Sequence, residues 1–389
     1  MRILHVVTLL GPDGAYGGPA RVALNQSAAL IDRGHEVTVA AGTRGFRVTP
    51  NRVDGVPVQL FPARTLVPGT GFAGIGAPGL QRWFHRNRTR FDLVHIHLGR
   101  DLVVLPVAVC ARRHEIPFAV QTHGMIIPSG HPLAGPLDAL WTRKVLRAAG
   151  AVFHLTALER DQLNAVTRTD SGASGPRFVE LGNGVPEYLP RRSSPSRRSS
   201  PSRRSSPEAP EVLFVARIHA RKRPTAFVET ARALLASGID ARFTLVGPDG
   251  GDGRALRTAL AAAPDTRISW EGALDPAEVP GRMAAASVYV LPAVREPYPM
   301  SVLEAMSVGL PVVVTRDCGL ASLIERSGCG VVTDPEVPAL ADAVATLLAN
   351  EPLARAMGEN GRRTVQTHQG MRAVADRLLD TYEDMVGAL

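Results

Sequence analysis

The sequence predicts an α/β protein made of two domains, each built on a parallel β-sheet. Short β-branched strand patterns alternate with helical patterns along the first half of the chain, and the alternation starts again after residue 211. Strands that alternate with helices are typical of βαβ units, whose strands run parallel. At 389 residues, 45% of them hydrophobic, the chain is long enough for two such domains.

The first domain is expected over residues 1–187. Its predicted strands are Ile3–Thr8, Glu36–Ala41, Val56–Phe61, Leu93–Ile96, Phe118–Gln121, Ala151–His154 and Phe178–Leu181. Between them, apolar residues recur at helical spacing in Ala20–Arg33, Gly79–His85, Leu102–Arg113, Leu137–Ala148 and Ala157–Ala165.

Residues 188–210 are expected to form a disordered linker. The hexad Arg-Arg-Ser-Ser-Pro-Ser occurs almost three times between Arg191 and Pro207, with no residue that could join a core. Two interpretations remain open: an arm for phosphorylation or anionic surfaces, and a neutral expansion of an interdomain linker. Linkers tolerate insertions because the entropy of loop closure grows slowly with length.

The second domain is expected over residues 211–369, and a last helix, 370–389, is expected to return to the first domain. The predicted strands are Val212–Val215, Arg242–Val246, Ile268–Glu271, Val288–Leu291, Val312–Thr315 and Gly330–Thr333. This layout predicts a cleft between two sheets, onto which the carboxyl ends of their strands open.

Charge and cysteine content narrow the class of protein. The formal net charge is +8, but the six arginines of the linker supply most of it, so no nucleic-acid partner is expected. Cys110, Cys318 and Cys329 show no metal-ligand spacing and cannot all pair, which favours a reducing cytoplasm. The apolar N-terminus lacks a cleavage motif and is interpreted as a first strand. No run approaches the roughly 18 apolar residues of a membrane span.

A glycine-rich segment, Gly14-Ala15-Tyr16-Gly17-Gly18, follows the first predicted strand. Because a helix follows, its backbone amides could approach a diphosphate at the helix N-terminus. A tight turn is the alternative. Neither Gly-x-Gly-x-x-Gly nor an acid after the second strand is present, which argues against a dinucleotide-binding redox enzyme.

Charged side chains also follow predicted strands in both domains. Arg217 ends the first strand of the second domain and Lys222 comes five residues later, a pair that suits a phosphate ligand. The alternative is a solvated basic loop. In the first domain, His123 lies just past a strand, where it could meet a ligand or be an ordinary structural histidine.

Two acids eight residues apart, Glu296 and Glu304, flank the start of a helix after the strand Val288–Leu291. Ser301-x-x-Glu304 fits a capping box, which would make Glu304 a structural residue. In the other interpretation, the amides around Met300–Val302 meet a phosphate, Glu304 holds vicinal hydroxyls and Glu296 binds a sugar hydroxyl. Spacing alone leaves both open.

With both halves in view, the sequence resembles the family 4 retaining glycosyltransferases of the GT-B fold. The resemblance covers nearly the whole chain except the Arg/Ser tract. Its motifs, in order, are Gly17-Gly18, Asp92-Leu93-Val94-His95-Ile96-His97, Thr122-His123-Gly124, Asn183-Gly184-Val185, Arg217 with Lys222, Leu245-Val246-Gly247 and Glu296-x7-Glu304.

The resemblance implies two Rossmann-like domains facing across a deep cleft. It implies transfer of a hexose from a nucleotide-diphosphate sugar, of GDP-mannose or UDP-hexose type, to a glycan, lipid-linked or small-molecule acceptor. Alternatives are a sugar-nucleotide epimerase of the same fold and a non-catalytic nucleotide-sugar binder.

The resemblance also implies roles for single residues. Glu304 would hold the donor ribose, Glu296 would meet a hydroxyl of the transferred sugar, and His123 would touch the sugar from the opposite domain. Arg217 and Lys222 would stabilise the departing diphosphate; the other donor-binding residues would be Gly17, Gly18, Asn183, Met300, Ser301 and Val302. Such enzymes need no metal, so neither a metal nor another cofactor is expected, and no Asp-x-Asp occurs here.

Two positions depart from the usual pattern of this family. Arg223 stands where a glycine usually follows the lysine, and Pro299-Met300 replaces a frequent glycine-containing pair. Neither departure removes a charged group, and both bear on the choice of donor.

A basic helix in the first domain suggests a membrane partner. Its residues Leu137, Leu140, Trp141, Val145 and Ala148 are predicted to share one face, flanked by Arg143, Lys144 and Arg147. Such a helix can bind an anionic surface and bring a lipid-linked acceptor to the cleft. An ordinary surface helix with its apolar face turned inward is the alternative. The expected location is the cytoplasm, or the inner face of the cell membrane as a peripheral protein.

Overall fold

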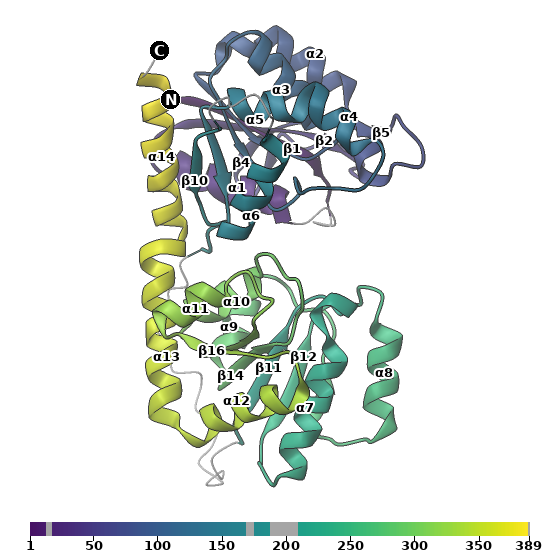
Figure 1. Cartoon of the computed structure of the whole chain (residues 1–389), viewed down its shortest axis with the longest axis vertical. Helices are drawn as coiled ribbons and strands as arrows, with labels where there is room; N and C mark the ends of the chain where they lie inside the picture. The colour runs from purple at the N-terminus through teal and green to yellow at the C-terminus, as the bar shows by residue number, and fades with distance from the viewer. Residues whose placement is uncertain (13–17, 169–174, 187–208, 388–389) are drawn as a thin grey trace. The chain divides into compact units, whose positions relative to one another are not determined.

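The computed structural model describes residues 1–12, 18–168, 175–186 and 209–387. The chain divides into two compact units: the first comprises Met1–Gly184 with Met371–Leu389, and the second comprises Val185–Gly370 (Figure 1). Gly17 and almost all of the predicted linker, 188–210, lie outside the described residues.

The first unit contains an eight-stranded sheet in the order β10-β9-β8-β7-β1-β2-β4-β3, parallel except for the short β3–β4 pair. Its strands are β1 Arg2–Leu10, β2 Glu36–Thr43, β3 Arg52–Val53, β4 Val56–Pro62, β7 Leu93–His97, β8 Phe118–Gln121, β9 Ala151–His154 and β10 Phe178–Glu180, with a separate hairpin of β5 Arg64–Thr65 and β6 Ile75–Gly76. Its helices are α1 Gly18–Ile31, α2 Pro78–Asn87, α3 Val104–Arg113, α4 Ala134–Leu137, α5 Arg143–Ala148, α6 Ala157–Thr167 and α14 Met371–Gly387.

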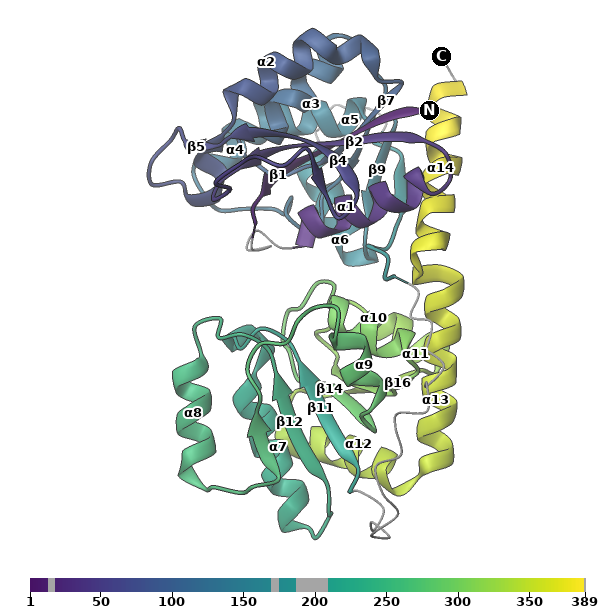
Figure 2. The ribbon, with the colours of Figure 1, turned by 180° about the vertical axis from the view of Figure 1, so that it is seen from behind.

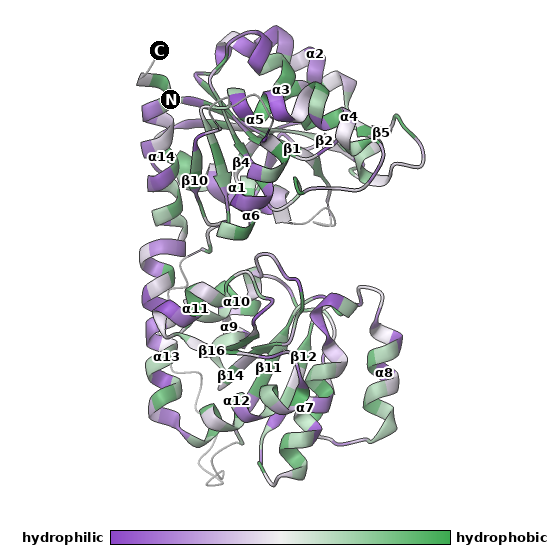
Figure 3. Cartoon of the chain, viewed as in Figure 1, coloured by the Kyte–Doolittle hydropathy of each residue, from purple (hydrophilic) through white to green (hydrophobic). Residues whose placement is uncertain are grey.

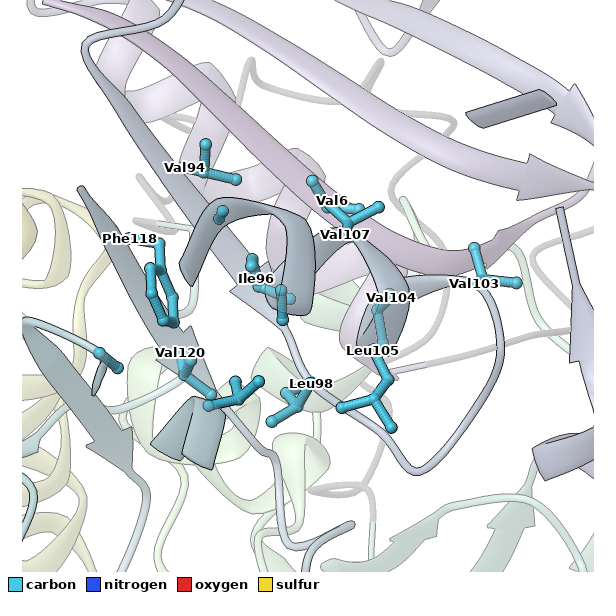
Figure 4. Close-up of a cluster of buried hydrophobic side chains, with 14 of the residues drawn as sticks. Val6, Val94, Ile96, Leu98, Val103, Val104, Leu105, Val107, Phe118 and Val120 are labelled. Atoms are coloured by element: carbon cyan, nitrogen blue, oxygen red, sulfur yellow. The ribbon is translucent and has the colours of Figure 1, made fainter. Parts of the chain in front are cut away.

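Helices cover both faces of this sheet. On one face, α2, α3 and α5 pack aliphatic side chains against β1, β7 and β8, and Figure 4 shows the centre of this core around Ile96 and Val107. On the other face, α1 lies beside α14 (Figure 2). The α14 ribbon alternates between hydrophobic and hydrophilic bands (Figure 3), and its buried Leu378 and Tyr382 join the core of the first unit. The final helix is thus an integral part of that unit.

The second unit contains a six-stranded, fully parallel sheet in the order β13-β12-β11-β14-β15-β16. Its strands are β11 Glu211–Val215, β12 Arg242–Val246, β13 Ile268–Trp270, β14 Val288–Leu291, β15 Val312–Thr315 and β16 Gly330–Thr333. Its helices are α7 Pro224–Ala236, α8 Gly253–Ala262, α9 Val279–Ala284, α10 Met300–Ser307, α11 Ala321–Ser327, α12 Val337–Ala349 and α13 Glu351–Thr364.

Every strand predicted from the sequence is present, within one or two residues at its ends, so the α/β prediction is confirmed. The predicted helix Leu137–Ala148 differs in its centre, where Asp138–Thr142 form a π-helical turn. At this turn the buried Asp138 carboxylate lies 2.8 Å from the Arg100 guanidinium. Among the described helices, none is both long and apolar enough to cross a membrane.

The prediction that this helix has a single apolar face is wrong. Leu140 and Trp141 are exposed, but Val145 is fully buried in the core, because the helix turns that side toward α3 and the sheet. The flanking Arg143 and Arg147 donate hydrogen bonds to the carbonyls of Val166 and Thr167. Of the predicted surface, Leu140, Trp141, Lys144 and Ala148 are exposed. Membrane association stays a prediction.

Candidate functional site

The strand order of the second unit marks one place as a ligand site. Counted along the unit, the order is 3-2-1-4-5-6, so the connections leave in opposite directions from β11 and β14 (Figure 1). Ligands of open α/β sheets bind at such a switch point, beyond the carboxyl ends of the two strands. The loop after β11 carries Arg217 and Lys222, and the loop after β14 carries Glu296. The sheet therefore brings together residues that are about 70 positions apart in sequence.

Lys222 and Glu296 form the centre of this arrangement. The Lys222 ammonium lies 2.8 Å from Glu296 Oε2, and the two side chains are only 16% and 8% exposed. The exposed Arg221 guanidinium lies 3.2 Å from the same oxygen. A backbone hydrogen bond from Val294 to the carbonyl of Arg221 fastens one loop to the other. A half-buried ammonium is therefore held in place by a buried carboxylate.

The backbone conformation of Arg223 explains why glycine usually follows the lysine in the family that the sequence resembles. Its backbone is left-handed, with φ +54°, and it precedes α7, which begins at Pro224. Glycine adopts this conformation without strain, whereas arginine does not. Here the Arg223 guanidinium donates hydrogen bonds to the carbonyls of Pro292 (3.3 Å) and Pro335 (2.6 Å). These bonds anchor the side chain and offset the strain, and the first of them reaches the segment that follows β14.

The capping-box interpretation of Ser301 and Glu304 is wrong. Helix α10 begins at Met300 with Pro299 as its N-cap, so Ser301 lies inside the first turn and Glu304 beyond it. The Ser301 hydroxyl lies 2.7 Å from that of Tyr289, and the Tyr289 hydroxyl lies 3.1 Å from the carbonyl oxygen of Val215. The Met300 and Ser301 amides are in the first turn of the helix, where no intrahelical acceptor exists.

Glu304 is a half-buried carboxylate. Burial raises the pKa of its carboxyl above the ordinary value. Within the described part of the chain, no hydrogen bond or ion pair engages the carboxylate oxygens. A partly desolvated carboxylate without a protein donor gains from hydrogen bonds that a ligand donates. Two vicinal hydroxyl groups of a ribose are donors of the required kind.

Arg217 is exposed at the end of β11. Its aliphatic carbons lie directly over Gly250, where an added Cβ would come within 2.4 Å of Arg217 Cγ. The loop after β12 therefore supports the stem of Arg217 and leaves its guanidinium in solvent, where it is available to an anion.

In the first unit, the loop after β8 holds His123 in a left-handed conformation, with φ +51°. Such backbone strain in a residue other than glycine persists where its surroundings enforce it, and is frequent at functional sites. The enforcing residue is the buried Glu159, whose Oε1 accepts from Thr122 Oγ1 and from the Gly124 amide, both at 2.5 Å. Its Oε2 accepts from the Leu155 amide at 2.7 Å. The sequence reasoning missed Glu159, although Thr156-x-x-Glu159 is a visible helix-start motif.

Both ring nitrogens of His123 are engaged within the first unit. Nδ1 lies 3.1 Å from Asn183 Oδ1, and Nε2 lies 2.7 Å from His97 Nδ1. His97 Nε2 in turn lies 3.1 Å from His5 Nδ1. One tautomer satisfies the whole series: each ring donates from Nδ1, and the last donation goes to the Asn183 amide oxygen. The structure thus places Asn183, buried, as the partner of His123.

These rings belong to a column of four histidines: the buried His5, His95 and His97, and the half-buried His123. Three pairs stack with centroids 4.7–5.0 Å apart: His5 with His95, His95 with His97, and His97 with His123. His95 also bonds to the Tyr382 hydroxyl of α14. Burial lowers the pKa of His5 to about 3 and that of His123 to about 4, and holds the pKa values of His95 and His97 well below the ordinary range. All four rings are therefore neutral at pH 7.

The histidine column predicts acid sensitivity. In the unfolded chain these rings bind protons below about pH 6.5, whereas in the folded chain His5 and His123 stay neutral until about pH 3 to 4. Because the unfolded state then binds more protons, stability falls as the pH falls. At pH 5 each of these two rings should cost about 2 kcal/mol relative to pH 7.5.

Urea unfolding at pH 7.5 and pH 5 measures this effect. In His5→Gln, the change in unfolding free energy between the two pH values should be about 2 kcal/mol smaller than in the wild type. In His368→Gln, which alters an exposed histidine of the second unit, that change should equal the wild-type value. An unfolding free energy that is the same at both pH values would refute the neutral column.

The described residues thus form two groups of candidates. In the second unit, Arg217, Lys222, Glu296, Glu304 and the start of α10 gather at the switch point. In the first unit, His123 and Asn183 are in contact. Gly18 begins α1, and a Cβ built on it would meet no non-adjacent described residue within 4 Å. Gly17 is outside the described residues.

Comparison with known proteins agrees with this division. The family described as "Glycosyl transferase 4-like domain" matches residues 17–184, and "Glycosyl transferases group 1" matches residues 196–364. An alpha-D-kanosaminyltransferase of Streptomyces kanamyceticus is 27% identical over 81% of this chain and 84% of its own length. A D-inositol 3-phosphate glycosyltransferase of Corynebacterium glutamicum is 26% identical over 99% of this chain and 91% of its own.

Solved structures share the fold. The HepE protein of Anabaena, crystallised with UDP, superposes with a TM-score of 0.76 at 17% identity, covering 99% of this chain and all of that one. Together, the two matching families and the shared fold place this chain among the family 4 glycosyltransferases of the GT-B fold.

Proposed function

We propose that the chain is a retaining hexosyltransferase that uses a nucleoside-diphosphate sugar and requires no metal ion. The observation that carries this proposal is the Lys222–Glu296 pair at the switch point between β11 and β14. A nucleoside diphosphate leaving group acquires negative charge as the glycosidic bond breaks. Fixed cations and helix amides can take up that charge in the place of a metal.

Each candidate site residue of the second unit has a specific role in this proposal. Lys222 and Arg217 bind the diphosphate, the lysine as a point charge and the arginine through two parallel hydrogen bonds. The Met300 and Ser301 amides donate to a phosphate at the positive end of α10. Glu304 accepts hydrogen bonds from the ribose, and Glu296 both fixes Lys222 and meets a hydroxyl of the transferred sugar.

In the first unit, His123 is proposed to contact the transferred sugar, with Glu159 and Asn183 fixing its loop and ring. Because both ring nitrogens already have partners, the contact uses the ring edge or the backbone at His123 unless one of those bonds opens. For the acceptor we propose a small polyol, since a similar enzyme is named for D-inositol 3-phosphate.

A thermal-shift panel of sugar nucleotides tests the donor class. A ligand at one hundred times its dissociation constant stabilises the folded chain by about 2.7 kcal/mol. For a chain of this length that is a rise in Tm of about 3 °C. We expect UDP-hexoses or GDP-hexoses to produce it without added metal and in the presence of a chelator, and free hexoses not to.

Two outcomes would contradict the proposal. Stabilisation that appears only with a divalent cation would refute metal independence. Conversion of the sugar nucleotide into its epimer without an acceptor would point to an epimerase instead. A donor consumed only when a polyol such as inositol phosphate is added supports a transferase.

A further inference from the structure

Three potential metal ligands meet on the first unit where α2 and α3 lie side by side (Figure 1). His85 is in the last turn of α2, Cys110 is in α3, and His114 caps the end of α3. The ligand atoms of these three residues all lie within 4.8 Å of one another, and Cys110 Sγ lies 3.9 Å from His85 Nδ1. In a tetrahedral zinc site, N and S ligands lie about 3.6 Å apart, given Zn–N near 2.1 Å and Zn–S near 2.3 Å. A small rotation of the side chains closes the difference.

The surroundings of this cluster make it accessible to an ion. Both imidazoles are exposed and the thiol is partly exposed, so a metal can enter from solvent without any movement of the core. The two rings lie with centroids 5.2 Å apart at 57°, tilted rather than stacked. Cys110 and His114 are four residues apart on one helix and therefore share a face.

Within the first unit, the cluster is remote from His123, the candidate sugar-contacting residue. Helix α2 ends before β7 begins, and α3 ends before β8 begins, so both helix ends lie at the edge of the sheet where these strands start. His123 follows β8 and lies at the opposite edge. A metal bound by the cluster would therefore not touch the sugar site of the first unit.

We propose that His85, Cys110 and His114 bind one zinc ion, with a water molecule in the fourth position. One thiolate and two imidazoles are a soft N/S set that suits zinc and disfavours magnesium or calcium. On binding, two Zn–N bonds and one Zn–S bond form, and the Cys110 thiol releases its proton to the buffer. The ion joins the C-terminal ends of α2 and α3 and stabilises the folded first unit.

Positive charge near the cluster opposes the binding of a zinc ion. Arg88 and Arg113 act electrostatically on the Cys110 thiol, so a dication adds to positive charge already present. The thiolate formed on binding offsets one unit of it. Because dissolved salt screens this repulsion, raising the salt concentration should tighten zinc binding.

The test uses the full chain without an affinity tag, freed of metal and titrated with zinc chloride against a chromophoric chelator. We expect one zinc per chain, with an affinity at least tenfold lower in Cys110→Ser and in His114→Ala. His368→Ala removes an exposed histidine of the second unit and should bind zinc like the wild type. Cobalt should give the thiolate-to-metal charge-transfer absorption in the wild type and not in Cys110→Ser.

Thermal unfolding separates a built site from adventitious binding. One equivalent of zinc should raise the Tm of the wild type and leave that of Cys110→Ser unchanged, while the metal-free proteins melt alike. Zinc binding of equal affinity in wild type and Cys110→Ser, or the lack of a one-to-one complex in the wild type, would overturn the proposal. Because no donor is present in these measurements, they do not depend on the proposed transferase activity.

Discussion

Replacing Lys222 by alanine should lower kcat about 10² to 10³-fold, with a smaller effect on the KM for the donor. The reason is that a fixed positive charge acts most strongly where negative charge develops in the transition state, here on the departing diphosphate. The rate of product formation at saturating donor measures the effect. A turnover equal to that of the wild type would exclude Lys222 from the chemistry.

Arg221 provides a matched control for this variant. Its guanidinium contacts the same Glu296 oxygen, but its side chain is 49% exposed, and exposed ion pairs contribute little. Arg221→Ala should therefore retain nearly full turnover. Removal of Lys222 also leaves the buried Glu296 carboxylate without its closest partner, which can destabilise the unit. The double variant Lys222→Ala/Glu296→Gln has no unpaired buried carboxylate at this position, so it should fold well and remain inactive.

Replacing Glu304 by glutamine should separate ligand affinity from stability. The carboxylate is half-buried, and its raised pKa reflects the cost of desolvating its charge. The neutral amide of similar shape should leave the free protein at least as stable. Loss of two charge-assisted hydrogen bonds to the ribose should weaken donor binding by about 2 to 3 kcal/mol, or roughly 30 to 150-fold.

Calorimetric titration with the nucleoside diphosphate, together with Tm of the free protein, checks both halves of this prediction. A purely structural role would give the reverse pattern, with a lower Tm and unchanged affinity. Ser307→Ala serves as the control, because Ser307 lies on the same helix and, among the described residues, its hydroxyl bonds only to the carbonyl of Glu304.

Local pattern was enough to predict the strands of both units and most helices of the first unit. What it could not provide is the order of strands in the sheet, because β11 pairs with β14 across more than 70 residues of intervening chain. Arg217, Lys222 and Glu296 were each identifiable as side chains beyond strand ends. That they face one switch point follows only from this pairing.

The start of α10 shows how a local motif can mislead. Ser301-x-x-Glu304 has the sequence of a capping box, yet Pro299 already supplies an extended N-cap, and the helix begins at Met300. The serine hydroxyl is held by Tyr289, a partner from β14 that no local pattern reveals. Glu304 is thereby left without a capping role.

Part of the histidine column could have been predicted from the sequence. His95 and His97 are two residues apart on β7 and therefore share one face of the sheet. His5 on β1 lies in register with His95. Alternating polar residues in an otherwise buried strand already require partners. The metal-ligand cluster was harder to predict, because His85 comes from a different helix, 25 residues before Cys110.

Hydrogen exchange with and without the sugar nucleotide identified by the panel tests the central claim most directly, since it locates the ligand on the full chain. Bound donor should slow amide exchange in residues 216–223 and 292–304, the two loops of the switch point in the second unit. Exchange in α3, Val104–Arg113, should not change. Protection confined to the first unit, with none in either loop, would contradict the assignment of the donor site to Lys222, Glu296 and Glu304.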